Sequence, residues 1–430
     1  MPTRSPSAYS SLSPGDMEVD GRPAPPYGEQ DASTTQLLAD AGQAILYTAN
    51  RPNIVMERGA GMYIWDTDGK SYLDFIGGWA VNALGHSPSV LHEALAAQSG
   101  QLVHASPGFY NKPMIQFARR LTELSGYDRV FFASSGSEAN ESAIKLARKY
   151  GSVHLSGACE IVTTIGSFHG RTLATMSATG KPQWEPLFAP KVAGFRHVPF
   201  NDIEAMRQAV GDRTCAIMIE PVQGEGGVHP AAGEYVAGLR ELCDERGILL
   251  VFDEVQTGIG RTGKLFAFEH YGVRPDIVTL AKGIGGGFPL SAMLTLEKHN
   301  LFEAGEQGGT YTGQPLAMAA GSAVVEEVVR QRLSQRAEQM GAVIREGLQS
   351  IAERFGLERI RGLGLLIGFD LPRSVGSELV AAALANGLLI NAPSPAVIRL
   401  MPPLIVSEED AAIMLDRLTA SLEQALGGRP

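Results

Sequence analysis

The sequence contains very few cysteines. Three occur among 430 residues, Cys159, Cys215 and Cys243, and they lack the close spacing of a zinc site. We therefore expect reduced cysteines and no disulfide framework. The nine histidines include no His-Glu-x-x-His pattern or other close ligand pair on a helix face, so we expect no structural or catalytic metal.

Long apolar runs and an excess of positive charge are also missing. No apolar run approaches the roughly 18 residues that a membrane span needs, and the first residues lack the apolar stretch of a signal peptide. The net charge of -10 would repel the phosphates of nucleic acids or anionic membranes. With 44% hydrophobic residues, the chain predicts a cytoplasmic, enzyme-sized protein whose partners are small molecules.

Composition and pattern divide the chain into four parts. Residues 1–34 are rich in Ser, Pro, Gly and acidic residues, which predicts a flexible tail. Residues 35–85 carry a hairpin signal around Asp66–Gly69 and are expected to pack with the small domain. Residues 86–322 are expected to form a large cofactor-binding domain, and residues 323–430 a small α+β domain.

The expected large domain alternates short apolar runs with amphipathic stretches, which predicts an α/β fold with a mostly parallel sheet. In such sheets ligands bind beyond the carboxyl ends of the strands. Polar residues follow or end the apolar runs at this edge: Ser135, His169, Glu220, Asp253 and Lys282.

Two of these residues suggest a specific chemistry. Lys282 ends the run 277–281 and precedes a glycine-rich turn, and Asp253 ends the run 248–252. A pyridoxal phosphate (PLP) enzyme needs a lysine for a Schiff base and an anion on the pyridine nitrogen. An ion pair at ~4 Å in an intermediate dielectric is worth roughly 4 kcal/mol, about three pKa units, which is enough to keep that nitrogen protonated. The alternatives are a solvated loop lysine and a helix-capping aspartate.

The turn at residues 134–137 is a candidate phosphate site. It joins an apolar run to a predicted helix, so the free backbone amides of the turn and the helix dipole can hold a phosphate. An ordinary cap is the alternative, because Ser135 and Glu138 have capping-box spacing. Phe168 could stack on a cofactor ring or serve as a core aromatic.

Two arginines are candidate substrate ligands. Arg171 follows Phe168, and Arg399 lies in the apolar run 397–400. The guanidinium fork binds carboxylates through paired hydrogen bonds, although a structural salt bridge is the alternative for each. Glu220 is expected to pair with Arg399 when no dicarboxylate is bound.

Taken together, these motifs resemble the class III (subgroup II) aminotransferases of PLP fold type I, and within them the acetylornithine enzymes. The resemblance runs from about residue 44 to residue 418. It is carried by NALGH at 82–86, SSGSEANESAIKLAR at 134–148, FHGRT at 168–172, EPVQGEGG at 220–227, FDEVQTGIGRTG at 252–263, AKGIGGGFP at 281–289 and GTYTGQP at 309–315.

The resemblance implies roles for individual residues. The cofactor set would be Lys282 as the Schiff-base lysine, Asp253 on the ring nitrogen, Gln256 near the ring hydroxyl, Phe168 on the ring, and Gly136 and Ser137 on the phosphate. Thr310 would reach the phosphate of the partner subunit, which implies a homodimer with shared active sites. Arg171 would hold the α-carboxylate of the amino donor, and Arg399, controlled by Glu220, would receive 2-oxoglutarate.

The implied reaction transfers the terminal amine of N-acetylornithine, or a similar ω-amino acid, to 2-oxoglutarate, as in arginine biosynthesis. The alternatives are a 4-aminobutyrate aminotransferase, a PLP epimerase or decarboxylase of the same fold, and a silent PLP-binding regulator. Five positions depart from the usual family pattern: Trp79, Pro88, Ser89, Thr312 and Gln314. Among them, Trp79 is expected to reshape the substrate entrance. His169, in contrast, matches the acetylornithine and 4-aminobutyrate enzymes rather than the ornithine δ-aminotransferases.

Overall fold

The computed structural model describes residues 33–427. The predicted tail, residues 1–34, lies outside this range except for its last two residues. Ser33 caps helix α1 (Thr34–Ala44) by accepting a hydrogen bond from the amide of Gln36.

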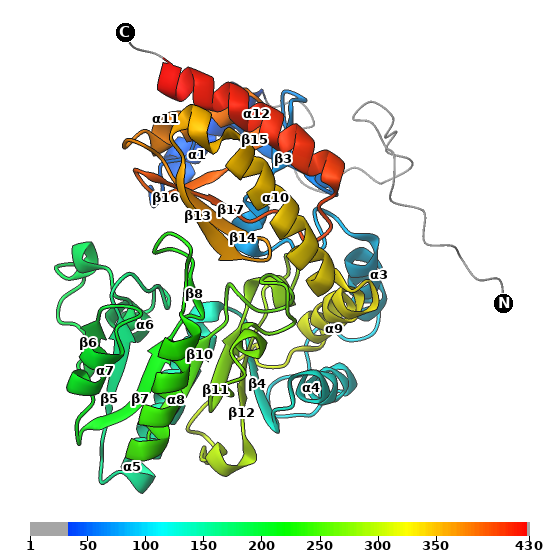
Figure 1. Cartoon of the computed structure of the whole chain (residues 1–430). Coiled ribbons are helices and arrows are strands. Elements are labelled where there is room, and N and C mark those ends of the chain that lie inside the picture. Colours follow the sequence, from blue (N-terminus) through cyan, green and yellow to red (C-terminus); the bar gives the residue numbers. More distant parts are fainter. Residues whose placement is uncertain (1–32, 428–430) are drawn as a thin grey trace.

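The centre of the molecule is a seven-stranded sheet in the lower half of Figure 1. Its strands, in spatial order, are β4 (Arg129–Ala133), β12 (Ser291–Thr295), β11 (Ile277–Leu280), β10 (Leu249–Asp253), β7 (Thr214–Ile219), β5 (Glu160–Thr164) and β6 (Phe195–Val198). Only β12 runs antiparallel to its neighbours β11 and β4. The predicted α/β fold with a mostly parallel sheet is confirmed.

Alternate residues of these strands face two separate apolar layers. On one face, Ala216 and Met218 pack with the apolar side of α5 (Gly136–His154). On the other, Ile217 and Ile219 join a larger core that includes Leu239 of α8 (Gly233–Arg246). Two shorter helices, α6 (Leu173–Ala178) and α7 (Ile203–Ala209), complete the cover beside β6.

Two smaller sheets lie in the upper half of Figure 1. One is antiparallel and contains, in order, β13 (Glu358–Leu363), β14 (Leu366–Asp370), β17 (Val397–Leu400) and β16 (Asn391–Ser394). The other contains β1 (Met56–Ala60), β2 (Tyr63–Asp66), β3 (Ser71–Asp74) and β15 (Leu388–Leu389). In this second sheet Leu73 pairs with Leu388, so the early segment and the C-terminal part share one sheet.

Helices connect and cover these layers. The helices α3 (Ser89–Ser99) and α4 (Lys112–Ser125) pack on α9 (Pro315–Arg330), while α10 (Leu333–Phe355) and α11 (Gly376–Ala385) pack against the terminal helix α12 (Glu408–Gly427). Ser407 caps α12 by accepting from the amide of Asp410 at 3.1 Å. The domain boundary expected between residues 322 and 323 falls inside α9.

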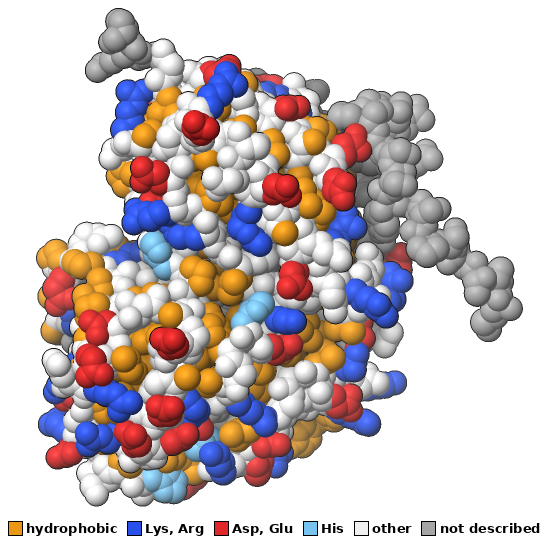
Figure 2. Space-filling model, in the orientation of Figure 1, with side chains coloured by type: hydrophobic (Ala, Val, Ile, Leu, Met, Phe, Trp, Pro, Cys, Tyr) orange, Lys and Arg blue, Asp and Glu red, His pale blue; other side chains and the backbone are white. Residues whose placement is uncertain are grey.

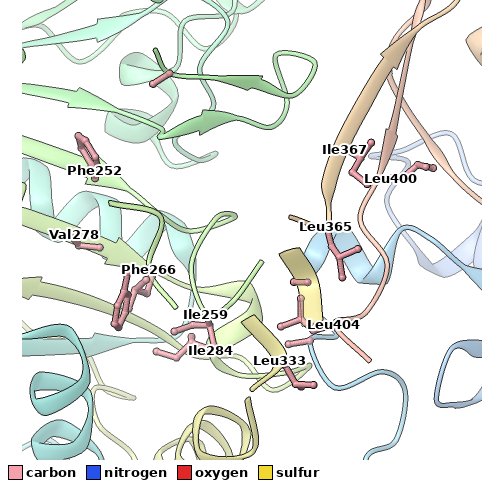
Figure 3. Close-up of a cluster of buried hydrophobic side chains, with 14 of the residues drawn as sticks. Phe252, Ile259, Phe266, Val278, Ile284, Leu333, Leu365, Ile367, Leu400 and Leu404 are labelled. Carbon is pink, nitrogen blue, oxygen red and sulfur yellow. The ribbon is translucent and has the colours of Figure 1, made fainter. Parts of the chain in front are cut away.

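One apolar core crosses the junction between the two halves. Figure 3 shows Phe252 and Val278 of the large sheet in the same cluster as Ile367 and Leu400 of the upper sheet. Figure 2 shows acidic and basic side chains mixed over the face drawn there. Within residues 33–427, no helix has the length and apolarity to cross a membrane.

Candidate active site

A cavity of about 290 Å³ opens at the carboxyl ends of the central strands. Its wall comes from the segments that follow β4, β5, β7, β10 and β11. The residues that were predicted from the sequence and that line it are Gly136, Ser137, Phe168, Glu220, Asp253, Gln256 and Lys282. The fold therefore brings these side chains, which are far apart in the sequence, to one place.

The N-terminus of α5 forms one end of the cavity. Ser135 caps the helix by accepting from the amide of Glu138, and the amides of Gly136 and Ser137 donate to no residue between 33 and 427. A Cβ atom on Gly136 would lie 2.7 Å from Cγ1 of Val255, so only glycine fits here without a shift. Capping and anion binding are compatible at this turn, since the cap occupies a different amide.

Asp253 lies at the end of β10 and is buried. Its Oδ2 atom accepts from Nδ2 of Asn140 at 2.7 Å and lies 2.8 Å from Nδ1 of His169. The Oδ1 atom accepts from the amide of Val255 at 3.0 Å. These donors fix the orientation of the carboxylate.

Lys282 begins the short helix η3 (Lys282–Ile284) directly after β11, with a positive φ of 49°. A non-glycine residue in this conformation is strained, and such strain is concentrated at functional sites. Burial, and after it the positive charge of Arg399, together lower the pKa of Lys282 to about 8, against the opposing effect of Glu225 and Asp253. The amine can therefore accept and release a proton near neutral pH.

Arg399 is fully buried on β17 of the upper sheet and contacts two residues that line the cavity, Glu225 and Gln256. Nη2 donates to Oε1 of Glu225 at 2.6 Å, and Nη1 donates to Oε1 of Gln256 at 3.3 Å. Asn391 Oδ1 accepts from both Nε and Nη2. Arg399 is thus held at every nitrogen, and Glu225 is its one charged partner among residues 33–427.

The expected pairing of Glu220 with Arg399 is therefore wrong. Glu220 instead accepts from the amides of Phe168 and Gly224, and burial raises its pKa to about 7. Glu225 lies five residues further along, in the hairpin between β8 (Val222–Gln223) and β9 (His229–Pro230). Burial alone would raise the pKa of Glu225, but Arg399 and then Lys181 outweigh it and lower that pKa.

Three predicted residues lie outside the cavity lining: Arg399, described above, Arg171 and Thr310. Arg171 is exposed, and its guanidinium packs 5.1 Å from the ring centroid of Trp184 and 5.9 Å from that of Phe168. Thr310 lies in an exposed loop, where its carbonyl oxygen is 2.8 Å from Nε2 of His104. The substrate role of Arg171 and the partner-subunit role of Thr310 remain predictions.

Trp79 belongs to a left-handed turn, the short element α2 (Gly77–Ala80), in which all four residues have positive φ between 56° and 67°. Trp79 and Ala80 are not glycines, so the turn is strained. The indole of Trp79 is 49% exposed, and Val81, two residues later, lines the cavity. The turn therefore adjoins the cavity, and the expected effect of Trp79 on the entrance stays a prediction.

The geometry of a lysine, a fixed aspartate and a helix N-terminus around one cavity agrees with the comparison of the chain with known proteins. The sequence profile of the family described as "Aminotransferase class-III" matches residues 46–422. The chain belongs to the class III aminotransferases. An acetylornithine aminotransferase of Bordetella bronchiseptica is 50% identical over 378 residues, covering 87% of this chain and 96% of that protein. The acetylornithine aminotransferase of Caldanaerobacter subterraneus is 48% identical over 368 residues, or 85% of this chain and 94% of that one.

Solved structures agree with this assignment. The ornithine aminotransferase of Toxoplasma gondii superposes with a TM-score of 0.89 at 30% identity, covering 93% of this chain and 97% of that one. The N-acetylornithine aminotransferase of Stenotrophomonas maltophilia gives 0.79 at 35% identity, covering 91% and 100%. The protein is therefore an aminotransferase of PLP fold type I, and its cofactor is PLP.

The cavity residues fit this cofactor. Gln256 has a buried Nε2 atom with no hydrogen-bond partner among the described residues, which suits the ring hydroxyl. The free amides of Gly136 and Ser137 suit the phosphate, and Asp253 suits the ring nitrogen. When bound, PLP supplies an aldehyde that condenses with amines and a protonated ring that withdraws electrons from the neighbouring carbon.

Sequence reasoning missed three residues that shape the site. Asn140 orients Asp253, and a polar residue on the otherwise apolar side of α5 could have revealed it. Glu225 stands between glycines in a motif that had been noted only for its first residue. Lys181, 3.5 Å from Glu225, follows a glycine in a loop and carries no local signal.

Proposed function

We propose that this enzyme transfers the terminal amine of N-acetylornithine, or of a similar ω-amino acid, to 2-oxoglutarate, giving a semialdehyde and glutamate. The observation that carries the proposal is the pairing of buried Arg399 with Glu225, which lines the same cavity as Lys282. An arginine with a removable acidic partner can serve two substrates in turn. Relatives described as acetylornithine aminotransferases, at 46–50% identity, support the choice of donor.

The two half-reactions make different demands on Arg399. A donor that is not a dicarboxylate leaves Arg399 without a substrate partner, and Glu225 neutralises the buried charge. The second carboxylate of 2-oxoglutarate would replace Glu225 and form a bidentate pair with the guanidinium. We call this exchange the Arg399 gate.

The proton transfer falls to Lys282. Because the pKa of its amine is lowered to about 8, the neutral form is accessible at physiological pH. Lys282 would take the proton from the substrate carbon next to the nitrogen and return it to the cofactor side. Asp253, held by Asn140 and His169, would keep the ring nitrogen protonated throughout.

We further propose that the active enzyme is a homodimer whose sites are shared. Thr310 is exposed beside apolar side chains that a second copy would cover: Leu102, Val103, Phe109, Tyr110 and Tyr311. The contact between His104 and the Thr310 carbonyl joins the two segments that carry these side chains. With N-acetylornithine as donor, the reaction would belong to arginine biosynthesis in the cytoplasm.

A donor panel tests the proposal. Glutamate formation from 2-oxoglutarate should be fastest with N-acetylornithine, and slower with ornithine and 4-aminobutyrate. Preference for 4-aminobutyrate would favour the alternative donor. Absence of turnover with every ω-amine, in a protein that binds PLP, would favour the silent regulator and contradict the proposal.

A further inference from the structure

Lys181 makes a contact that the proposed reaction does not use. Its Nζ atom lies 3.5 Å from Oε2 of Glu225, while Oε1 of the same carboxylate accepts from Arg399 at 2.6 Å. Two cations thus face the two oxygens of one carboxylate. Only one of the two contacts has the length of a charge-assisted hydrogen bond.

Aromatic rings hold Lys181 in place. Its ammonium lies 5.0 Å from the ring centroid of Phe168 and 5.1 Å from that of Trp184. Cation–π contacts of this kind stabilise the charge without satisfying its hydrogen-bond donors. The side chain is 17% exposed, so the ammonium is partly desolvated and has a donor available for a carboxylate.

Glu225 can change partner by rotating only its side chain. A Cβ atom on Gly224 would lie 1.7 Å from Oε1 of Gln256, and one on Gly226 would lie 2.6 Å from the carbonyl oxygen of Gly166. These close approaches fix the hairpin backbone on both sides of Glu225. Arg399 meanwhile keeps its contacts with Asn391 and Gln256 when Glu225 leaves.

We infer that Lys181 is the docking cation for Glu225 in the open state of the Arg399 gate, and so a specificity-determining residue for dicarboxylate substrates. The inference rests on the proposed function. In the closed state the Lys181 contact is long, and it shortens when the carboxylate turns away from Arg399. Lys181 therefore favours the open state, in which 2-oxoglutarate binds, without touching the substrate.

Binding of inert acids to the holoenzyme tests this directly by calorimetry. Glutarate is a five-carbon dicarboxylate that needs the open gate, and valerate is its monocarboxylate counterpart. Lys181→Gln is expected to weaken glutarate binding about fivefold, the effect of a partly exposed ion pair, and to leave valerate binding unchanged. Lys181→Arg should restore glutarate binding, and Lys298→Gln serves as a charge-matched control at an exposed site away from the cavity.

A double-mutant cycle separates gate docking from direct substrate contact. In a Glu225→Gln background, Lys181→Gln should have no further effect on glutarate, because the charge it docks is absent. An equal loss in both backgrounds would overturn the inference, as would unchanged or tighter glutarate binding in Lys181→Gln alone. Measurement of the two half-reactions is a second test. In Lys181→Gln, the KM for 2-oxoglutarate should rise while the rate of the donor half-reaction stays unchanged. If the donor panel fails but the glutarate cycle behaves as expected, the proposed amino donor is wrong, whereas dicarboxylate binding at Arg399, the part of the proposed function on which the inference rests, is supported.

Discussion

His169 Nδ1 lies 2.8 Å from Oδ2 of Asp253, and both side chains are buried. Because a carboxylate only accepts hydrogen bonds, Nδ1 carries the proton and donates it. The other ring nitrogen, Nε2, has no partner within residues 33–427. His169 therefore positions the carboxylate of Asp253, the predicted partner of the ring nitrogen.

The first prediction concerns this pair. His169→Phe keeps the ring volume but removes one donor from Asp253, and a hydrogen bond to a charged group is worth about 1.5–3 kcal/mol. We expect kcat to fall by at least tenfold and the pH dependence of the cofactor absorbance to shift. His299→Phe is a matched control, because His299 contacts Asp276 at 3.0 Å in another buried pair. Equal effects of the two changes on kcat would show that only stability had been altered.

The second prediction follows from the lowered pKa of Lys282. The neutral amine is the form that attacks the PLP aldehyde, and it predominates above a pKa of about 8. The rate of covalent cofactor uptake by the apoenzyme should rise with pH below 8 and level off above it, as followed by stopped-flow absorbance. The unfolded chain binds the extra proton between pH 8 and 10.5, so apoenzyme stability should also rise across that window. Lys282→Met should lose the covalent phase, and a rate that is flat from pH 6 to 9 would contradict the assignment.

The third prediction tests the phosphate end of the cavity. Gly136→Ala places a methyl group 2.7 Å from Val255 and should displace the α5 N-terminus, weakening PLP binding about tenfold by equilibrium titration. Pyridoxal without its phosphate should be affected much less. Gly233→Ala is the control, because Gly233 also begins a helix and an added Cβ atom would have nothing within 4 Å. Similar losses for both cofactor forms would place the phosphate elsewhere.

The fourth prediction concerns shared sites. Lys282→Ala and Thr310→Asp should each be inactive, but subunits mixed through unfolding and refolding should regain about a quarter of wild-type activity, since half the dimers then hold one intact site. Mixing Lys282→Ala with Asp253→Asn should regain nothing, because both residues serve the same subunit's site. If the first mixture also stays inactive, Thr310 does not act across the interface.

Local patterns allowed much of the fold to be predicted. The apolar runs identified five strands of the large sheet, and the capping-box spacing of Ser135 and Glu138 indicated the start of α5. Other features depended on tertiary packing. The break between α9 and α10 occurs at Arg332, which has a positive φ of 54° and no glycine to signal it.

The cavity lining was predicted because parallel strands deliver their carboxyl ends to one edge. The acidic partner of Arg399 was assigned to the wrong residue for an equally physical reason. Glu220 and Glu225 both belong to one glycine-rich motif, residues 220–227, and the choice between them depends on how the hairpin between β8 and β9 lies relative to β17. The sequence alone does not show which of the two glutamates lies nearer to Arg399.

The pairing of β3 with β15 has a consequence for synthesis of the chain. Leu73 cannot pair with Leu388 until the ribosome has added 315 further residues. This synthesis takes roughly 15–60 s at ribosomal elongation rates. Until then, strands β1, β2 and β3 form a three-stranded sheet in which β3 is an unpaired edge strand. Such an edge is a target for chaperones or for pairing with a neighbouring nascent chain. Truncation of the chain before Leu388 would leave the edge of β3 permanently unpaired.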